Sequence, residues 1–310
     1  MSGGQWEIGV VYRWLHANDF FVGHDPGPPP FGLPVHINIH SFQLNLTYAA
    51  TSRLSFQVGI PFAMGSELRG QEDRQLHRLS AAGLGDVNLV AKTWLLHPVQ
   101  HSRSNISLGL GLKAPTGQSE KAGVFYLAAG DEIRSLDPSV QLGDGGWGVI
   151  GQFDAFAQLA RRTSGYVAAS YLANPRAHTG ATFHLPYGVI APVAVTDEYS
   201  AHAGVGYVLA PRHAFTVSLG GRIDGVPVHD RFGGGDDSFR RPGYVIYAEP
   251  TISYTLTKSP LSTAGSTFTL SVPYALDQNR QASALDVANG KHGGGDFAKF
   301  LVFIGYSKRF

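Results

Sequence analysis

Cysteine is absent from the 310-residue chain. Its absence excludes a disulfide framework, a thiolate metal site and a cysteine nucleophile. Charge is scarce as well, because charged residues make up 15% and the formal net charge is +1. A nucleic-acid-binding protein normally carries a clustered basic excess, so we expect no nucleic-acid partner. No run approaches the roughly 18 apolar residues of a membrane-spanning helix.

Apolar residues instead recur at every second position over long stretches, which is the period of a β-strand. Phe42, Leu44 and Leu46, for example, alternate with Gln43 and Asn45. About twelve such strands follow one another, many of them much longer than the usual globular strand of about 5 or 6 residues. A tilted strand of roughly ten residues can cross a lipid bilayer.

The connections between these strands alternate in length. The first two strands are joined by a long piece that contains GHDPGPPPFGLP, residues 23–34. Further long connections are expected at about 63–82, 117–144, 174–200, 224–243 and 277–296, and short ones at 50–53, 97–105, 161–165, 210–214 and 257–265. A soluble sandwich has no reason to sort its loops in this way. A barrel inserted from one side has short inner turns and long outer loops.

These patterns predict one all-β domain over residues 1–310: a transmembrane, antiparallel up-and-down β-barrel of about 12 strands with short periplasmic turns and long extracellular loops. The lipid bilayer of the bacterial outer membrane is the expected surrounding. No secretory signal is visible at the N-terminus. If the protein is exported, we expect its signal peptide to have been removed. The alternative is a large soluble all-β protein whose aromatic side chains fill a core.

The final residues, FLVFIGYSKRF, place Phe300, Val302, Ile304, Tyr306 and Phe310 on one face of the last strand. This arrangement resembles the C-terminal signature of bacterial outer-membrane barrels, in which alternate apolar residues lead to a terminal aromatic. The resemblance implies that the barrel assembly machinery recognises these five residues. Lys308 departs from the signature.

Three inner stretches, GLGDVNLVAKTWLL, LGLGLKAPTGQSE and DPSVQLGDGGWGVIGQFDAF, begin at Gly83, Leu108 and Asp137. They resemble the outer-membrane proteins of the MetA phenol-degradation pathway, a family of transporters, over about the middle quarter of the chain. A Gly-Asp that opens a strand and a Pro-Thr-Gly that ends the next carry the likeness, with a basic residue between; here they are Gly85, Asp86, Lys92, Pro115, Thr116 and Gly117. The resemblance implies a channel for small hydrophobic or aromatic molecules.

The other motifs in the sequence do not predict a catalytic, cofactor or metal site. The spacing of GDGGWG, from Gly143 to Gly148, matches a dinucleotide fingerprint without the strand-helix context that makes one, and neither G-x-S-x-G nor H-E-x-x-H occurs. The two GGGD stretches, which end at Asp236 and Asp296, are read as flexible loop tips in preference to calcium ligands. We therefore predict no catalytic residue, cofactor or metal.

The polar faces of the strands are the candidate functional residues, because they should point together into the lumen. They are Glu7, Arg13, Gln43, Asn45, Gln57, Asp86, Asn88, Lys92, Lys113, Gln152, Asp154, Gln158, Tyr247 and Glu249. Twelve strands predict a narrow pore, and the apolar loop 183–195 is the favoured constriction. A passive channel for a small-molecule solute is the expected function. A barrel enzyme of the lipase, acyltransferase or protease type and a structural barrel that docks a partner protein are the alternatives, and the oligomeric state is left open.

Overall fold

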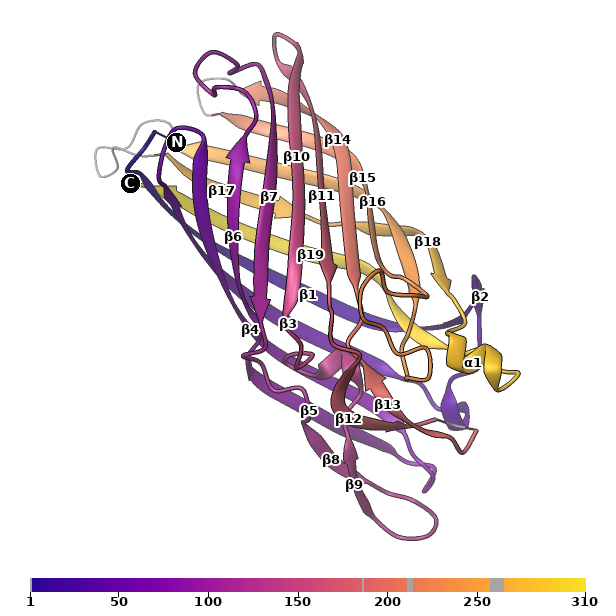
Figure 1. Cartoon of the computed structure of the whole chain (residues 1–310). Coiled ribbons are helices and arrows are strands. Elements are labelled where there is room, and N and C mark those ends of the chain that lie inside the picture. The colour runs from indigo at the N-terminus through magenta and orange to yellow at the C-terminus, as the bar shows by residue number, and fades with distance from the viewer. Residues whose placement is uncertain (1, 186, 211–213, 257–264) are drawn as a thin grey trace.

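The computed structural model describes residues 2–185, 187–210, 214–256 and 265–310. Its wall strands run side by side in one antiparallel sheet that closes on itself, because β19 (Gly295–Arg309) pairs with β1 (Trp6–Val22) from Glu7 with Arg309 to Phe21 with Gly295. Two further pairs of short strands form separate two-stranded sheets in the loops. Both termini lie at one end of the barrel (Figure 1). No helix in the described residues is long and apolar enough to cross a membrane.

Twelve barrel strands result once two interrupted strands are each counted as one. The remaining wall strands are β3 (His36–Ala49), β4 (Leu54–Gly70), β5 (Leu76–Leu84), β6 (Val87–Trp94), β7 (Ser104–Ala114), β10 (Gly148–Ala160), β11 (Thr163–Ala173), β14 (Glu198–Ala210), β15 (Phe215–Val226), β16 (Gly243–Leu256), β17 (Ser266–Ser271) and β18 (Tyr274–Arg280). β5 and β6 pair with successive parts of β4, and β17 and β18 with successive parts of β16. The predicted fold is confirmed.

Short elements lie in the connections at the end away from the termini. They are β2 (Asp25–Pro26), β8 (Ala122–Phe125), β9 (Glu132–Ser135), β12 (His178–His184), β13 (Ile190–Ala194), helix α1 (Ala284–Ala288) and two 3-10 turns, Pro30–Gly32 and Pro138–Val140. Figure 1 places most of them at or inside that end of the barrel. The short connections lie at the other end, and two of them, 210–214 and 257–265, fall partly outside the described residues.

One predicted long loop, 63–82, is wrong. β4 continues to Gly70 and β5 begins at Leu76, so these residues form an extended hairpin with a five-residue connection, 71–75. The period-two pattern fades there because both faces of the hairpin meet polar surroundings or other loops. Backbone pairing from Phe62 with Leu84 to Gly70 with Leu76 sustains the strands without that pattern.

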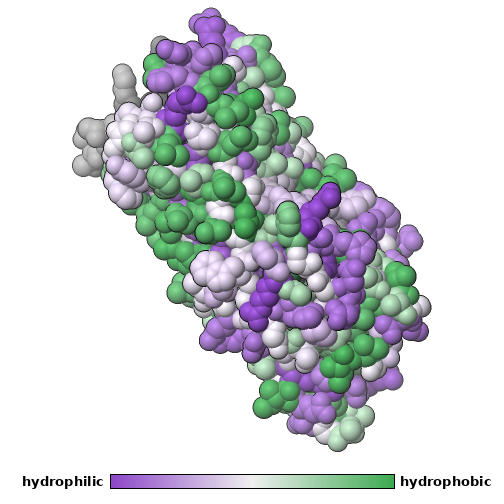
Figure 2. Space-filling model, in the orientation of Figure 1, coloured by the Kyte–Doolittle hydropathy of each residue, from purple (hydrophilic) through white to green (hydrophobic). Residues whose placement is uncertain are grey.

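The outer face of the barrel is apolar. Its exposed side chains include Ile8, Val10, Phe42, Phe56, Leu89, Leu108, Leu110, Leu112, Phe153, Val167, Leu219, Ile252, Leu270 and Ile304. In Figure 2 hydrophobic side chains gather over the half of the molecule nearer the termini, and hydrophilic ones dominate the loop end. A closed sheet with such a belt satisfies every wall hydrogen bond and can stand in hydrocarbon.

The last strand carries its apolar residues on this outer face. Ile304 and Phe310 are 51% and 56% exposed. Val302, Ile304 and Tyr306 lie opposite Trp14, Tyr12 and Val10 of β1. The sequence-predicted assembly signal, Phe300, Val302, Ile304, Tyr306 and Phe310, is therefore presented toward lipid.

Candidate functional site

The loop between β7 and β10, residues 117–145, carries the β8–β9 hairpin, which projects beyond the barrel end, and then enters the barrel over residues 136–145 (Figure 1); we call this loop the plug. Leu136 and Val140 are 2% exposed and Leu142 is 8% exposed. They pack against inward-facing wall residues of β3, β5, β16 and β19, among them Ile37 and Leu301. Burial of these apolar side chains, each worth about 1.5–3 kcal/mol, fixes the plug inside the barrel.

Both ends of the plug are fastened by charged residues of the wall. Asp86 accepts hydrogen bonds from the backbone N–H groups of Gly117, at 2.8 Å, and Asp144, at 3.2 Å. The Lys113 ammonium forms an ion pair with Asp144 and lies 3.7 Å from Asp86. Asp86 and Lys113 are thus anchors of the plug as well as inward-facing residues.

The strand breaks between β5 and β6 where Gly85 lies close to the backbone of the plug. A Cβ at Gly85 would lie 3.0 Å from the backbone oxygen of Leu142, and one at Gly117 would lie 2.5 Å from it. Thr116 donates its hydroxyl hydrogen to the Gly85 carbonyl at 2.8 Å. The Gly-Asp and Pro-Thr-Gly motifs therefore meet, and they form the seat of the plug.

The middle of the plug is held by one buried ion pair. Asp137, which is fully buried, accepts from Arg241 of the β15–β16 loop at 2.6 Å and from both the backbone and the hydroxyl of Ser139. Burial raises the pKa of Asp137, but the Arg241 guanidinium outweighs it, and the resulting pKa is about 2. The same pair raises the pKa of Arg241 against the effect of its own burial. Both groups are therefore ionised at neutral pH.

The β12–β13 hairpin covers the plug from the loop end. Phe183 stacks on Phe239 with the ring centroids 3.9 Å apart, and the Arg241 guanidinium lies 5.3 Å from the Phe239 ring centre. Ala191 and Val193 are buried in the same cluster. The apolar segment 183–195, favoured from sequence as the constriction, lies in this cover, whereas the plug makes the direct contact with the wall.

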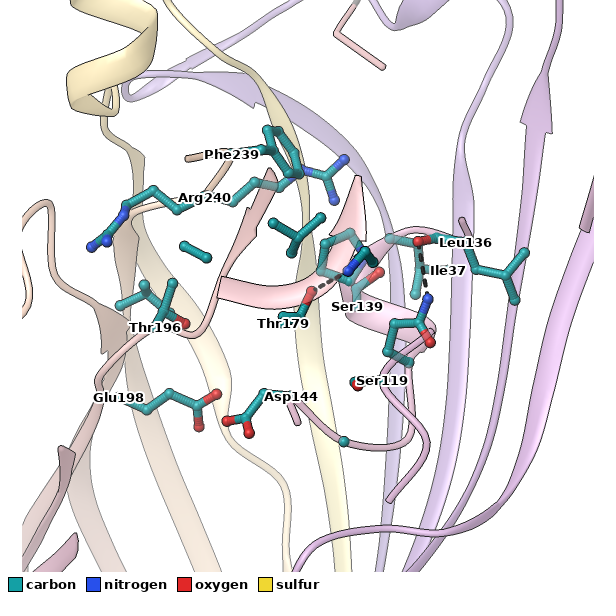
Figure 3. A pocket seen from close by; sticks show the side chains of 18 of the residues that line it. Ile37, Ser119, Leu136, Ser139, Asp144, Thr179, Thr196, Glu198, Phe239 and Arg240 are labelled. Carbon is teal, nitrogen blue, oxygen red and sulfur yellow. Dashed lines mark hydrogen bonds between the residues drawn. The ribbon is translucent and has the colours of Figure 1, made fainter. Parts of the chain in front are cut away.

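Three cavities lie between the loops and the plug. An outer groove of about 380 Å³ includes Phe31, Phe125 and Phe183; an outer cavity of about 300 Å³ includes Phe183 and Arg280; an inner cavity of about 280 Å³ includes Ile37 and Glu198. Figure 3 shows the Asp144 and Glu198 carboxylates facing each other on one side of the inner cavity, with Arg240 and Phe239 on the other.

The cavities share walls. The groove and the outer cavity have Phe183 and Leu185 in common, and the outer and inner cavities have Phe239, Arg240, Arg241 and Arg280 in common. The three cavities therefore adjoin one another at the loop end of the barrel.

All fourteen sequence-predicted lumen residues lie on the face opposite the exposed apolar side chains, and they fall into three groups. Asp86, Lys113 and Tyr247 contact the plug. Glu7, which pairs with Arg309 at 2.5 Å, and Gln158, which bonds the Arg161 carbonyl, lie near the short turns. The other nine, Arg13, Gln43, Asn45, Gln57, Asn88, Lys92, Gln152, Asp154 and Glu249, line the wall between these levels.

Polar contacts among this last group link side chains across neighbouring strands. Gln43 and Gln57 both donate to Asn45, at 3.1 and 2.9 Å. Lys92 pairs with Asp154 at 2.7 Å, across the small residues of β7. These pairs run along the wall, so they give the lumen a fixed pattern of charge.

Lys92 supplies a direct test of that pattern. Lys92→Glu places two carboxylates side by side, and we expect the channel's preference for cations over anions to rise by a few-fold, because a local positive charge becomes negative. The reversal potential in a potassium chloride gradient measures it. Lys308→Glu, which makes the same charge change on the outer face, should leave the reversal potential unchanged, and an equal shift in both variants would contradict a lumenal Lys92.

Sequence reasoning missed several charged residues of the site. His202 and Arg222 face the lumen, where both contact Glu249, at 3.1 and 3.7 Å. Their strands are rich in glycine and alanine, so the alternation that could have found them is weak. Asp137, Arg240, Arg241 and Arg280 lie in loops or at a strand end, and no periodic signal marks them.

The serine, histidine and glutamate side chains that meet at Glu249 are not arranged as a catalytic triad. Glu249 accepts from Ser271 and contacts His202, so the acid stands between the hydroxyl and the imidazole, where a catalytic triad has the imidazole in the middle. Asp236 contacts His229 at 3.0 Å and Asp237 lies 3.5 Å from His178. No group of three or more metal-ligating side chains occurs in the described part of the chain.

Comparisons with protein-family models and with curated protein sequences give no match. Among solved structures, the chain is similar to an outer membrane channel from Pseudomonas putida F1, with 12% identity, a TM-score of 0.63, and coverage of 100% of this chain and 97% of that one. A FadL homologue of Pseudomonas aeruginosa (10% identity, TM-score 0.45, coverage 100% and 90%) and the toluene transporter TodX of P. putida (11%, 0.43, 100% and 91%) are more distant. The first likeness establishes the fold, and with the exposed apolar belt it identifies the chain as an outer-membrane β-barrel.

Proposed function

We propose that this barrel is a passive channel that takes small molecules, hydrophobic or aromatic ones among them, across the outer membrane. The three adjoining cavities beside the plug carry the proposal. A cavity of about 150 Å³ is large enough for benzene, and each of the three exceeds that volume. The apolar lining of the groove, with Phe31, Phe125 and Leu127, supports a preference for hydrophobic solutes.

The seat of the plug supports a narrower proposal. Gly85, Asp86, Thr116 and Gly117 carry the resemblance to the phenol-degradation transporters, and here they share one role, because they receive the plug. We propose that the chain is a divergent member of that group.

Conductance and solute flux test the channel. Planar bilayers that contain the purified barrel should show discrete conductance steps, and liposomes should swell in small solutes. If both are absent and fatty acid is released from the lipid, the enzyme alternative holds. If both are absent and a second chain co-purifies, the barrel docks a partner.

We also propose that the barrel assembly machinery recognises the outer face of β19. Phe310→Ala removes the terminal aromatic and should lower the amount of heat-modifiable barrel in outer membranes several-fold. Phe268→Ala, which removes an outward ring from the neighbouring β17, is the matched control. Equal yields of the Phe310 variant and the unchanged protein would contradict the proposal.

A further inference from the structure

The outer cavity has a marked excess of positive charge. Five basic side chains line it, Arg69, Arg240, Arg241, Arg280 and Lys291, against a single carboxylate, Asp286. Both oxygens of that carboxylate are already occupied, because Oδ2 accepts from the backbone and hydroxyl of Ser283 and Oδ1 accepts from Tyr187. The cavity therefore offers cations and lacks a free anion of its own.

Three of these basic side chains already form ion pairs with carboxylates of the protein. Arg240 pairs with Asp230 at 2.7 Å, Arg241 pairs with Asp137, and Arg69 lies 3.4 Å from Glu67. Arg280 and Lys291 make no ion pair within the described residues.

Arg280 is the better placed of the two. Its guanidinium donates to the Arg241 carbonyl at 2.8 Å and lies 4.4 Å from the centre of the Phe297 ring, so two contacts hold it across the wall between the outer and inner cavities. Its Nε is buried and has no hydrogen-bond partner in the described part of the chain. Asp296 lines the inner cavity beside it without forming an ion pair. The Nε of Arg280 lies against Gly295 of β19. A buried guanidinium that lacks an ion-pair partner is costly, and a ligand carboxylate in the cavity would reduce that cost.

An aromatic surface lines the same cavity as this guanidinium. Phe183 and Phe239 line the outer cavity as a stacked pair with an interplanar angle of 6°. Phe20 and Pro30 add to the apolar wall. A planar ring packs well against such a surface, whereas an anionic group is repelled by the electronegative ring faces.

We propose that the outer cavity is a binding site for a small aromatic carboxylate, with its ring against Phe183 and Phe239 and its carboxylate on Arg280. The proposal rests on the channel function and names the class of solute. Asp144 and Glu198 in the inner cavity oppose an anion, and this weakens its hold beyond the wall. A conducting site must bind well enough to capture a solute and weakly enough to release it.

Benzoate binding to the purified barrel in detergent, measured by titration calorimetry, tests the site. Benzoate should bind more tightly than cyclohexanecarboxylate, which has the charge without the aromatic ring, and than benzyl alcohol, which has the ring without the charge. Arg280→Gln should lower the affinity for benzoate about tenfold or more, because a charge-assisted contact is lost. Arg162→Gln, at a short turn far from the cavity, should bind like the unchanged protein.

Two further variants test the site even if Arg280→Gln does not fold. Lys291→Gln, on the exposed rim, should lower the affinity for benzoate by a smaller factor. Phe239→Leu should lower the affinity for benzoate more than the affinity for cyclohexanecarboxylate. Equal binding of benzoate and benzyl alcohol, or unchanged affinity in folded Arg280→Gln, would overturn the proposal. If the barrel conducts but benzoate does not bind, the inference fails alone; if it neither conducts nor passes any solute, the proposed function fails.

Discussion

Replacing Asp137 with alanine is expected to open the plug and raise the conductance of the channel. The variant leaves Arg241 buried with no carboxylate partner, and breaking a buried ion pair from one side costs about 3–5 kcal/mol. It also removes the acceptor for Ser139. Because the wall is held by backbone pairing that does not involve Asp137, the barrel should stay closed while the plug leaves its seat.

Single-channel conductance and limited proteolysis measure the two parts of this result. Asp137→Ala should show larger conductance steps and faster cleavage within residues 117–145, with unchanged heat-modifiable migration on unboiled gels. Glu132→Ala is the control, since Glu132 lies in the same loop and pairs with Arg134 while half exposed. Loss of a surface pair costs about 0–1 kcal/mol. Conductance equal to that of the unchanged protein would show that Asp137 does not hold the plug.

The wall of the barrel could be predicted from sequence because the bilayer enforces a simple rule on each residue. Outward side chains must be apolar, so Leu44 and Leu270 repeat the same period as Ile304 although the chain separates them widely. The rule stops at the membrane surface. The pattern therefore predicts a loop over residues 63–82, where β4 and β5 in fact continue as strands.

The site could be predicted only in part, because a plug is made by long-range contacts. Asp86 and Lys113 were recognised as inward-facing from their strands, but nothing in their pattern indicated that Gly117 and Asp144 would return to them. Asp137 and Arg241 are 104 positions apart and both lie in irregular segments. A pair of this kind leaves no periodic trace in one sequence.

The two halves of the lumen differ in polarity. Toward the termini, Asn45, Lys92 and Asp154 repeat on wall strands and face a polar interior. Toward the loops, the interior is filled by Leu136 and Val140 and then by the aromatic cover. On the proposed route, a solute from outside therefore meets the aromatic cover and its basic cavity first and the polar lumen second.

Replacing Leu270 with arginine should destabilise the folded barrel by about 2–4 kcal/mol, the cost of a basic side chain on the lipid face near the bilayer midplane. Leu270 lies between Ile252 and Ile304 in a row of outward side chains across β16, β17 and β19. All three are exposed, at 43%, 44% and 51%. Arginine in this row has no water and no acceptor within the apolar belt.

Thr269→Arg is the matched control, because it puts the same side chain one position away on the same strand. Thr269 lies opposite Ser253 and Gly305 on the inward face, where water and polar side chains can solvate a guanidinium. Urea unfolding in lipid vesicles measures both free energies. The two variants add the same side chain to opposite faces of one strand, so exposure to lipid is expected to make the cost at Leu270 the larger one. An equal or larger cost at Thr269 would mean that the apolar face does not meet hydrocarbon, and the transmembrane barrel would have to be abandoned.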